Sequence, residues 1–175
     1  MKLLAFAASN SRESINKKLV TYAASLVEGA QVEILNINDY EMPIFSVERE
    51  NELGQPQLAK DFSQKISDAD ALLISFAEHN GSYTAAFKNL YDWTSRIDMK
   101  VYQNKPIVML STSPGGGGGR NVLATATSAA PHFGADLRAQ LSVPSFQENF
   151  DLETNSISNP EIQAKLISAL SLLSA

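Results

Sequence analysis

Three short apolar runs constrain the fold of this chain more than any other feature. Leu3–Ala8, Ala71–Ala77 and Pro106–Ser111 contain few polar residues and show no alternation of polar and apolar positions. Such runs are typical of central strands in a parallel sheet, because helices cover both faces of that kind of sheet. Two weaker runs, Gln31–Ile37 and Ala135–Val143, predict further strands, and the partial alternation in Gln31–Ile37 places it at an edge.

Segments with helical spacing separate the predicted strands. Ser14 is the expected N-cap of the first helix, Gly29 the residue that ends it, and Asn159 the N-cap before Pro160. This alternation predicts one α/β domain over residues 1–175. We expect a flavodoxin-like three-layer sandwich, with a five-stranded parallel sheet in the order 2-1-3-4-5 and helices on both faces. The predicted helices are Ile15–Glu28, Gln57–Asp68, Thr84–Ile97, Arg120–Phe133 and Pro160–Leu173.

The composition excludes several classes of function. The chain has 175 residues, a formal net charge of −5 and no cysteine. The acidic balance gives no support to a nucleic-acid surface, and the missing cysteine excludes disulfides and thiolate metal sites. No apolar run approaches the roughly 20 residues that a membrane-spanning helix needs, and the first residues show no signal-peptide pattern. We therefore expect no nucleic-acid partner, no membrane partner and a cytoplasmic location.

The loops after the central strands meet at one edge of a parallel sheet. The first, Ser9–Ser14, is rich in hydroxyl groups and precedes a helix, so its serines and backbone N–H groups suit a phosphate. It lacks the glycine pattern of a Rossmann site, the lysine of a P-loop and the acidic cluster of a magnesium site. We therefore expect it to hold a phosphate monoester without transferring it. The alternative is that the serines only cap the helix.

The other two loops contain turn-forming and flexible residues. In Ala77–Tyr83, Asn80 and Gly81 favour a tight turn with positive φ. Thr112–Gly119 ends in five consecutive glycines, which permit a close approach of the backbone to a flat or bulky ligand. A flexible hinge is the alternative use of these glycines.

At these three loops the sequence resembles the NADPH-dependent FMN reductase family, which includes chromate and quinone reductases. Residues 8–16 are similar to the motif G-S-x-R-x-x-S-x-N, with alanine for the first glycine and the arginine displaced by one position. Residues 77–93 resemble P-E-Y-N-G-S-x-P-x-x-L-K-N-x-x-D-W, and residues 111–119 resemble S-x-S-P-G-G-x-G-G. The second motif is broken at four positions, where Ala77, His79, Thr84 and Phe87 replace proline, tyrosine, proline and leucine.

The resemblance implies an NAD(P)H-dependent FMN oxidoreductase. It would transfer hydride from NADPH or NADH to flavin and on to a small acceptor such as a flavin or a quinone. Residues 9–16 would hold the FMN phosphate, residues 77–81 would line the isoalloxazine ring, and the third loop would face the ribityl or pyrimidine side. The flavin carries the chemistry, so no catalytic side chain and no metal ligand is predicted. The implied FMN contacts are Ser9, Ser11, Arg12, Ser14, Ile15, Asn16, Ala77, Glu78, His79, Asn80, Gly81, Ser113, Gly115 and Gly116.

Two other functions stand as alternatives. The first is a flavodoxin-type FMN electron carrier that acts through protein partners, although a net charge of −5 is mild for such a carrier. The second is an α/β binding domain that takes no flavin. The resemblance also implies a homodimer or a homotetramer. The segment Asn38–Pro56 is too long for a plain connector and is predicted to form an active-site wall or, with helix Thr84–Ile97, an interface.

Overall fold

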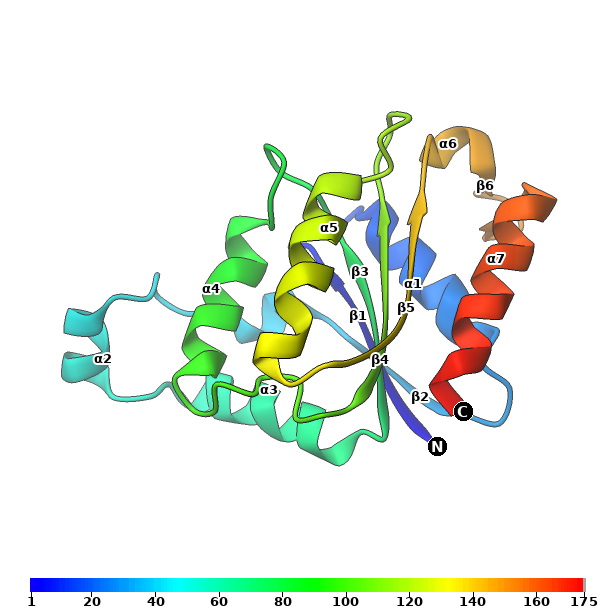
Figure 1. Ribbon diagram of the computed structural model, residues 1–175. Helices are drawn as coiled ribbons and strands as arrows, with labels where there is room; N and C mark the ends of the chain where they lie inside the picture. Colours follow the sequence, from blue (N-terminus) through cyan, green and yellow to red (C-terminus); the bar gives the residue numbers. More distant parts are fainter. Residues whose placement is uncertain (175) are drawn as a thin grey trace.

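The computed structural model describes residues 1–174, and a parallel sheet lies at its centre (Figure 1). The five strands lie in the order β2-β1-β3-β4-β5, and every neighbouring pair is parallel. The predicted strand order and the predicted edge position of the second strand are therefore confirmed. The strands are β1 (Lys2–Ala8), β2 (Gln31–Leu35), β3 (Ala71–Phe76), β4 (Pro106–Thr112) and β5 (Asp136–Val143).

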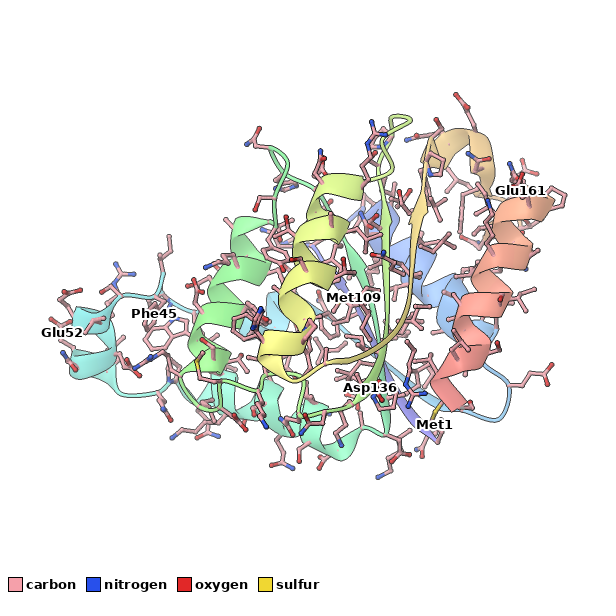
Figure 2. All side chains as sticks on the ribbon, in the orientation of Figure 1. Met1, Phe45, Glu52, Met109, Asp136 and Glu161 are labelled. Carbon is pink, nitrogen blue, oxygen red and sulfur yellow. The ribbon has the colours of Figure 1, made fainter. Side chains whose placement is uncertain are left out.

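Helices cover both faces of this sheet, as predicted. In β1, Leu4 and Phe6 contribute to the core on one face, whereas Leu3 and Ala5 contribute to the core on the other. Successive strand residues point to opposite faces, so a strand covered on both sides is mostly apolar instead of alternating. Met109 of β4 is fully buried at the centre of the sheet (Figure 2). One face carries α1 (Ile15–Ser25) and α7 (Pro160–Ser171), and the other carries α3 (Gln57–Asp68), α4 (Ala85–Ser95) and α5 (Arg120–Ala129).

The first helix is shorter than predicted. It ends at Ser25 instead of Glu28, because the N–H of its C-cap residue Leu26 turns back to the carbonyls of the preceding turn. Gly29 does adopt a positive φ of 70°, but it lies in the turn before β2 and does not end the helix. The prediction that Gly29 follows the last helical turn was therefore wrong.

The long segment between β2 and α3, predicted to be irregular, holds two short helical elements. η1 (Ile37–Tyr40) follows β2, and α2 (Val47–Leu53) projects away from the sheet beyond α4 (Figure 1). No residue of α2 is buried, so the sequence has no apolar period at that place. Only the capping residues at its two ends mark this helix in the sequence. Ser46 accepts a hydrogen bond from an N–H in the first turn, and Gly54 ends the helix with a φ of 68°.

The segment that follows β5 also holds short regular elements. The chain there passes from α6 (Phe146–Asn149) into an antiparallel hairpin formed by β6 (Phe150–Asp151) and β7 (Ser156–Ile157). Asn159 then caps α7, as predicted, by accepting hydrogen bonds from two backbone N–H groups of its first turn. Two more short elements, η2 (Ala130–Phe133) and η3 (Leu172–Ser174), extend α5 and α7.

Candidate functional site

The loops that follow β1, β3 and β4 lie at the same edge of the sheet, as the parallel topology requires (Figure 1). The loops after β3 and β4 rise above this edge, and the first loop leads directly into α1. The structure therefore brings together the three segments that the sequence singles out.

Two serines brace the first loop from inside. Ser14 is buried and caps α1, because its hydroxyl accepts a hydrogen bond from the N–H of Lys17 at 3.2 Å. Ser9 is also buried, and its hydroxyl accepts a bond from the N–H of Ser11 at 3.3 Å. Ser11 and Arg12 are exposed. Ser14 therefore does cap the helix, as the alternative interpretation of the sequence expected. The capping leaves the side chains of Ser11 and Arg12 free to face solvent.

Asn16 is an internal brace between α1 and the sheet. Its amide nitrogen donates to the carbonyl of Thr112 at 3.1 Å, and its amide oxygen accepts from the N–H of Thr112 at 3.0 Å. The same oxygen accepts from the hydroxyl of Ser75 at 2.7 Å. These bonds use both lone pairs of the oxygen and one amide hydrogen. The side chain thus ties α1 to β3 and β4, and it fixes the first loop relative to the third.

The second loop is a miniature hairpin. His79 and Ser82 exchange two backbone hydrogen bonds, of 3.0 and 3.1 Å, around a two-residue turn. Both turn residues have positive φ, 51° at Asn80 and 78° at Gly81, which is the geometry that an Asn-Gly pair adopts most readily. The predicted tight turn is confirmed. His79 is exposed, as are both turn residues.

Glu78 joins the second loop to the start of α5. The N-cap of α5 is Gly119, which has no side chain to offer. The carboxylate of Glu78 takes that place: it accepts from the N–H groups of Asn121 and Val122, each at 2.9 Å. A carboxylate at a helix N-terminus also interacts favourably with the helix dipole. The sequence gives no local signal for this contact, because 43 residues separate Glu78 from Asn121.

The third loop has two different halves. Gly118 and Gly119 both have positive φ and lie against the strands: the hydroxyls of Ser111 and Ser142 donate to the carbonyl of Gly118 at 2.7 and 3.0 Å. By contrast, the backbone at residues 115–117 has no positive φ, and no atom lies within 4 Å of where a Cβ would stand. The first half of the glycine run therefore presents bare backbone to open space.

The first turn of α1 is rich in positive charge. It contains Lys17 but no acidic residue, Lys18 comes next, and Arg12 precedes the helix. Cations are unfavourable at the positive end of the helix dipole. Arg12 and Lys17 also line a small cavity of about 110 Å³ beside Ser9 and Ser11. These three cations outnumber the one neighbouring carboxylate, Glu13, so the local charge is positive although the net charge of the chain is −5, which suits an anion.

The last part of the second motif has a structural role. Asn89 and Trp93 of α4 hold the segment before α2: Asn89 accepts from the N–H of Phe45 at 2.8 Å, and the indole of Trp93 donates to the carbonyl of Pro43 at 2.7 Å. Phe45 packs edge-on against Trp93 with ring centroids 5.1 Å apart. In Figure 2 Phe45 lies between α4 and the projecting α2. Trp93 is therefore a fully buried packing residue of α4.

The segment before α2 also lines a cavity. This cavity, of about 250 Å³, lies between the first loop, η1 and the start of α4, and its lining includes Asn10, Met42 and Asn89. Residues 37–44 are thus a wall beside the loop edge, whereas α2 extends beyond it. No group of His, Asp and Glu side chains within residues 1–174 has the arrangement of a metal site. No helix of the same part is long and apolar enough to cross a bilayer.

Comparisons with known proteins agree with this arrangement. The family model of NADPH-dependent FMN reductase matches residues 1–148. An NADPH:quinone oxidoreductase of Arabidopsis thaliana is 33% identical over 125 residues, which are 69% of this chain and 62% of that protein. The chain thus matches less than two thirds of the length of such curated relatives.

Solved structures support the fold. The flavoenzyme NAD(P)H:(acceptor) oxidoreductase FerB of Paracoccus denitrificans superimposes with a TM-score of 0.80, covering 99% of this chain and 97% of FerB at 22% identity. A flavodoxin variant of Pseudomonas aeruginosa matches over the full length of both chains with a TM-score of 0.60 at 12% identity. The flavodoxin-like three-layer fold predicted from the sequence is confirmed.

Proposed function

Because this chain belongs to the NADPH-dependent FMN reductase family, we propose that it is an FMN-dependent oxidoreductase that uses NADPH or NADH to reduce a small acceptor. The proposed acceptor is a flavin, a quinone or a similar small molecule, and a quinone is the acceptor named for the Arabidopsis relative. The observation that carries the proposal is the joined set of three loops, with a cationic helix start at one end and bare glycine backbone at the other.

The first loop fits a phosphate monoester. Arg12 and Lys17 supply positive charge, and the exposed part of Ser9–Ser14 supplies hydroxyl and backbone donors at the start of α1. The inner hydroxyls of Ser9 and Ser14 hold the loop in shape. In this assignment Ile15 and Asn16 contribute through the backbone of the first helical turn, since the side chain of Asn16 braces the sheet.

The second and third loops fit a flat ring. The proposed ring contacts are the backbone groups of residues 77–81, and Ser113, Gly115 and Gly116 are proposed to face the ribityl or pyrimidine side. The hydroxyl of Ser113 donates to the carbonyl of Gly115 at 3.1 Å, and that carbonyl also accepts from the N–H of Ser145 at 3.0 Å. These bonds fix the path of the loop while its Cα positions stay bare. A Cβ at those positions would fill space that a ring needs.

The protein groups position the reactants, and the cofactor supplies the hydride chemistry. Bound FMN would provide the ring that accepts and delivers hydride. The chain's part is to hold a phosphate, to orient a ring between two loops and to keep those loops at a fixed separation through Glu78. No acid–base side chain is needed for this work, and we assign no catalytic residue.

The projecting helix α2 and the residues just before it support the proposal of a homodimer or a homotetramer. Ile44 is 73% exposed, Val47 59% and Leu53 58%, although all three are large apolar residues. Exposed apolar side chains that gather on one segment are typical of an interaction surface. Light scattering after size exclusion tests this assignment, and a monomeric mass at high protein concentration contradicts it. The cytoplasmic location and the single domain over 1–175 stay as predictions.

The proposed reaction is tested by a steady-state assay of the purified chain with FMN, in which NADPH or NADH is oxidised in the presence of free flavin or a soluble quinone. We expect acceptor-dependent oxidation of the nicotinamide and a perturbed flavin spectrum on binding. A flavin spectrum that protein addition leaves unchanged overturns the proposal. Flavin binding with only slow nicotinamide oxidation and rapid one-electron cycling identifies the electron carrier instead.

A further inference from the structure

A third cavity runs along the outer side of α1. Its volume is about 420 Å³, and it extends from the first loop past the first two turns of the helix to the tip of the β6–β7 hairpin. No residue of this groove beyond the first helical turn belongs to the proposed FMN contacts. The lining residues are Arg12, Glu13, Ser14, Lys17, Lys18, Thr21, Tyr22, Ser25 and Asn155.

The groove has a positive local charge, because three cations and one carboxylate line it. Arg12, Lys17 and Lys18 line it, and Glu13 is the one acidic residue among the lining residues. None of these three cations forms an ion pair within the described part of the chain. Asp151 of the hairpin does not line the groove, and its carboxylate accepts hydrogen bonds from the N–H groups of its own turn.

The wall of the groove is rigid at its centre. The hydroxyl of Tyr22 donates to the side-chain oxygen of Gln163 on α7 at 2.7 Å. The ring of Tyr22 also packs edge-on against Phe150 of the hairpin, with centroids 6.0 Å apart. A fixed aromatic ring beside uncompensated cations is an arrangement that suits a nucleotide, which offers both a flat base and phosphate groups.

Two cations connect this groove with the proposed FMN phosphate site. Arg12 and Lys17 line the small cavity beside Ser9 and Ser11 as well as the groove, whereas Lys18 lines only the groove. The groove therefore begins where the phosphate site ends. A co-substrate that reaches the FMN from this side would place its distal part along α1.

We propose that the α1 groove binds the adenosine 2′-phosphate portion of NADPH, with Lys18 as the cation that distinguishes NADPH from NADH. This inference rests on the proposed function and adds the coenzyme subsite to it. NADPH differs from NADH by one phosphate monoester, so the selecting residue must be a cation outside the FMN phosphate site. Lys18 meets that condition, and its side chain is half-buried at the groove.

Binding of coenzyme fragments to the FMN-loaded protein gives a test that does not depend on turnover. Calorimetry compares adenosine 2′,5′-bisphosphate with adenosine 5′-monophosphate. We expect wild type to bind the bisphosphate about tenfold more tightly, because a charge-assisted contact to a phosphate is lost in the monophosphate. Lys18→Gln should remove most of this difference. Lys60→Gln is the matched control, since Lys60 is an exposed lysine on α3 at the other face, and it should retain the difference.

Kinetics and FMN titration separate the possible failures. Lys18→Gln should raise KM for NADPH about tenfold, with KM for NADH and FMN affinity unchanged. If wild type oxidises neither coenzyme, the proposed function fails. If it oxidises them and the NADPH-to-NADH ratio is the same in Lys18→Gln, the function stands and the subsite assignment is overturned. Inorganic phosphate that binds as tightly as the bisphosphate, with the same dependence on Lys18, shows a simple anion site and also overturns it.

Discussion

The two halves of the glycine run after β4 meet different surroundings. Gly118 and Gly119 are buried, have positive φ and lie against β4 and β5. Residues 115–117 have ordinary φ values and no neighbour near a would-be Cβ. The fold explains glycine at 118 and 119 and does not explain it at 115–117. A residue type that the fold does not require is better explained by a ligand, which is why Gly115 and Gly116 of this open half are included in the proposed site.

The largest effect on stability is expected in the buried half of the glycine run, Gly118 and Gly119. Gly118→Ala would place a methyl group against the hydroxyl of Ser142 and the backbone of Pro144, at a φ of 59° that side chains rarely adopt. We expect the free energy of unfolding to fall by about 3 kcal/mol. Denaturant unfolding measures this, with Gly117→Ala as the matched control, which should stay within about 0.5 kcal/mol of wild type. Equal losses in both variants would contradict the difference between the halves.

The open half should show the reverse pattern. In the double variant Gly115→Ala, Gly116→Ala, the added methyl groups meet no protein atom within 4 Å. Stability should therefore change by no more than about 0.5 kcal/mol per site. FMN affinity should fall about tenfold, because the methyl groups occupy space proposed for the ring. Flavin fluorescence titration measures the affinity, and a stable variant with unchanged FMN affinity would assign these glycines to a hinge.

Glu78 connects the second loop to α5, the helix that follows the glycine run. Glu78→Gln removes the charge that caps the N–H groups of Asn121 and Val122, and we expect a loss of about 1 kcal/mol in stability. FMN affinity should fall as well, because the two loops would no longer be held at one separation. Glu48→Gln on the projecting α2 is a control, since it also removes one carboxylate from a first helical turn. A Glu78 variant indistinguishable from this control in FMN affinity would refute the positioning role.

The smallest effect at neutral pH is expected beneath the second loop. The ring of Tyr83 packs on Phe76 and Phe87, with centroids 5.8 and 5.4 Å away, and burial raises the pKa of Tyr83 to about 12. Burial also raises the pKa of Tyr91 and of Tyr102. The folded state therefore holds these phenolic protons more tightly than the unfolded chain does. The contribution of these phenols to the free energy of unfolding is fully present below the unfolded pKa of about 10. It is lost as pH rises through the folded pKa.

Unfolding midpoints at pH 8, 10 and 11 measure this loss. Tyr83→Phe should make the dependence on alkaline pH shallower, because it removes one of the titrating phenols. A midpoint that stays constant from pH 8 to 11 in wild type would show that the phenols titrate alike in both states.

The strands were predictable because burial on both faces leaves a direct trace in composition. β1, β3 and β4 are mostly apolar and show no alternation of polar and apolar positions, and that pattern also indicates their central position. The helix α2 could not be predicted from period, since it buries nothing. The end of α1 was missed because Leu26 closes the helix through backbone bonds that need no glycine.

In the candidate site, too, the local features were predictable from the sequence and the long-range contacts were not. Its three loops were predictable, because each carries local turn or capping chemistry such as Asn80-Gly81. The contacts that join the loops were not. Glu78 caps a helix 43 residues away, and Asn16 bonds to Thr112 across 96 residues. Bonds between distant segments leave no periodic or local pattern in a single sequence.

The central claim is that the start of α1 holds the phosphate of FMN while the other two loops hold its ring. A titration of the flavin-free protein with FMN and with riboflavin tests it most directly, because the two ligands share the ring and differ only in the phosphate. The account predicts that FMN binds about 100-fold more tightly, and that high salt narrows the difference. Equal affinities for FMN and riboflavin would contradict it.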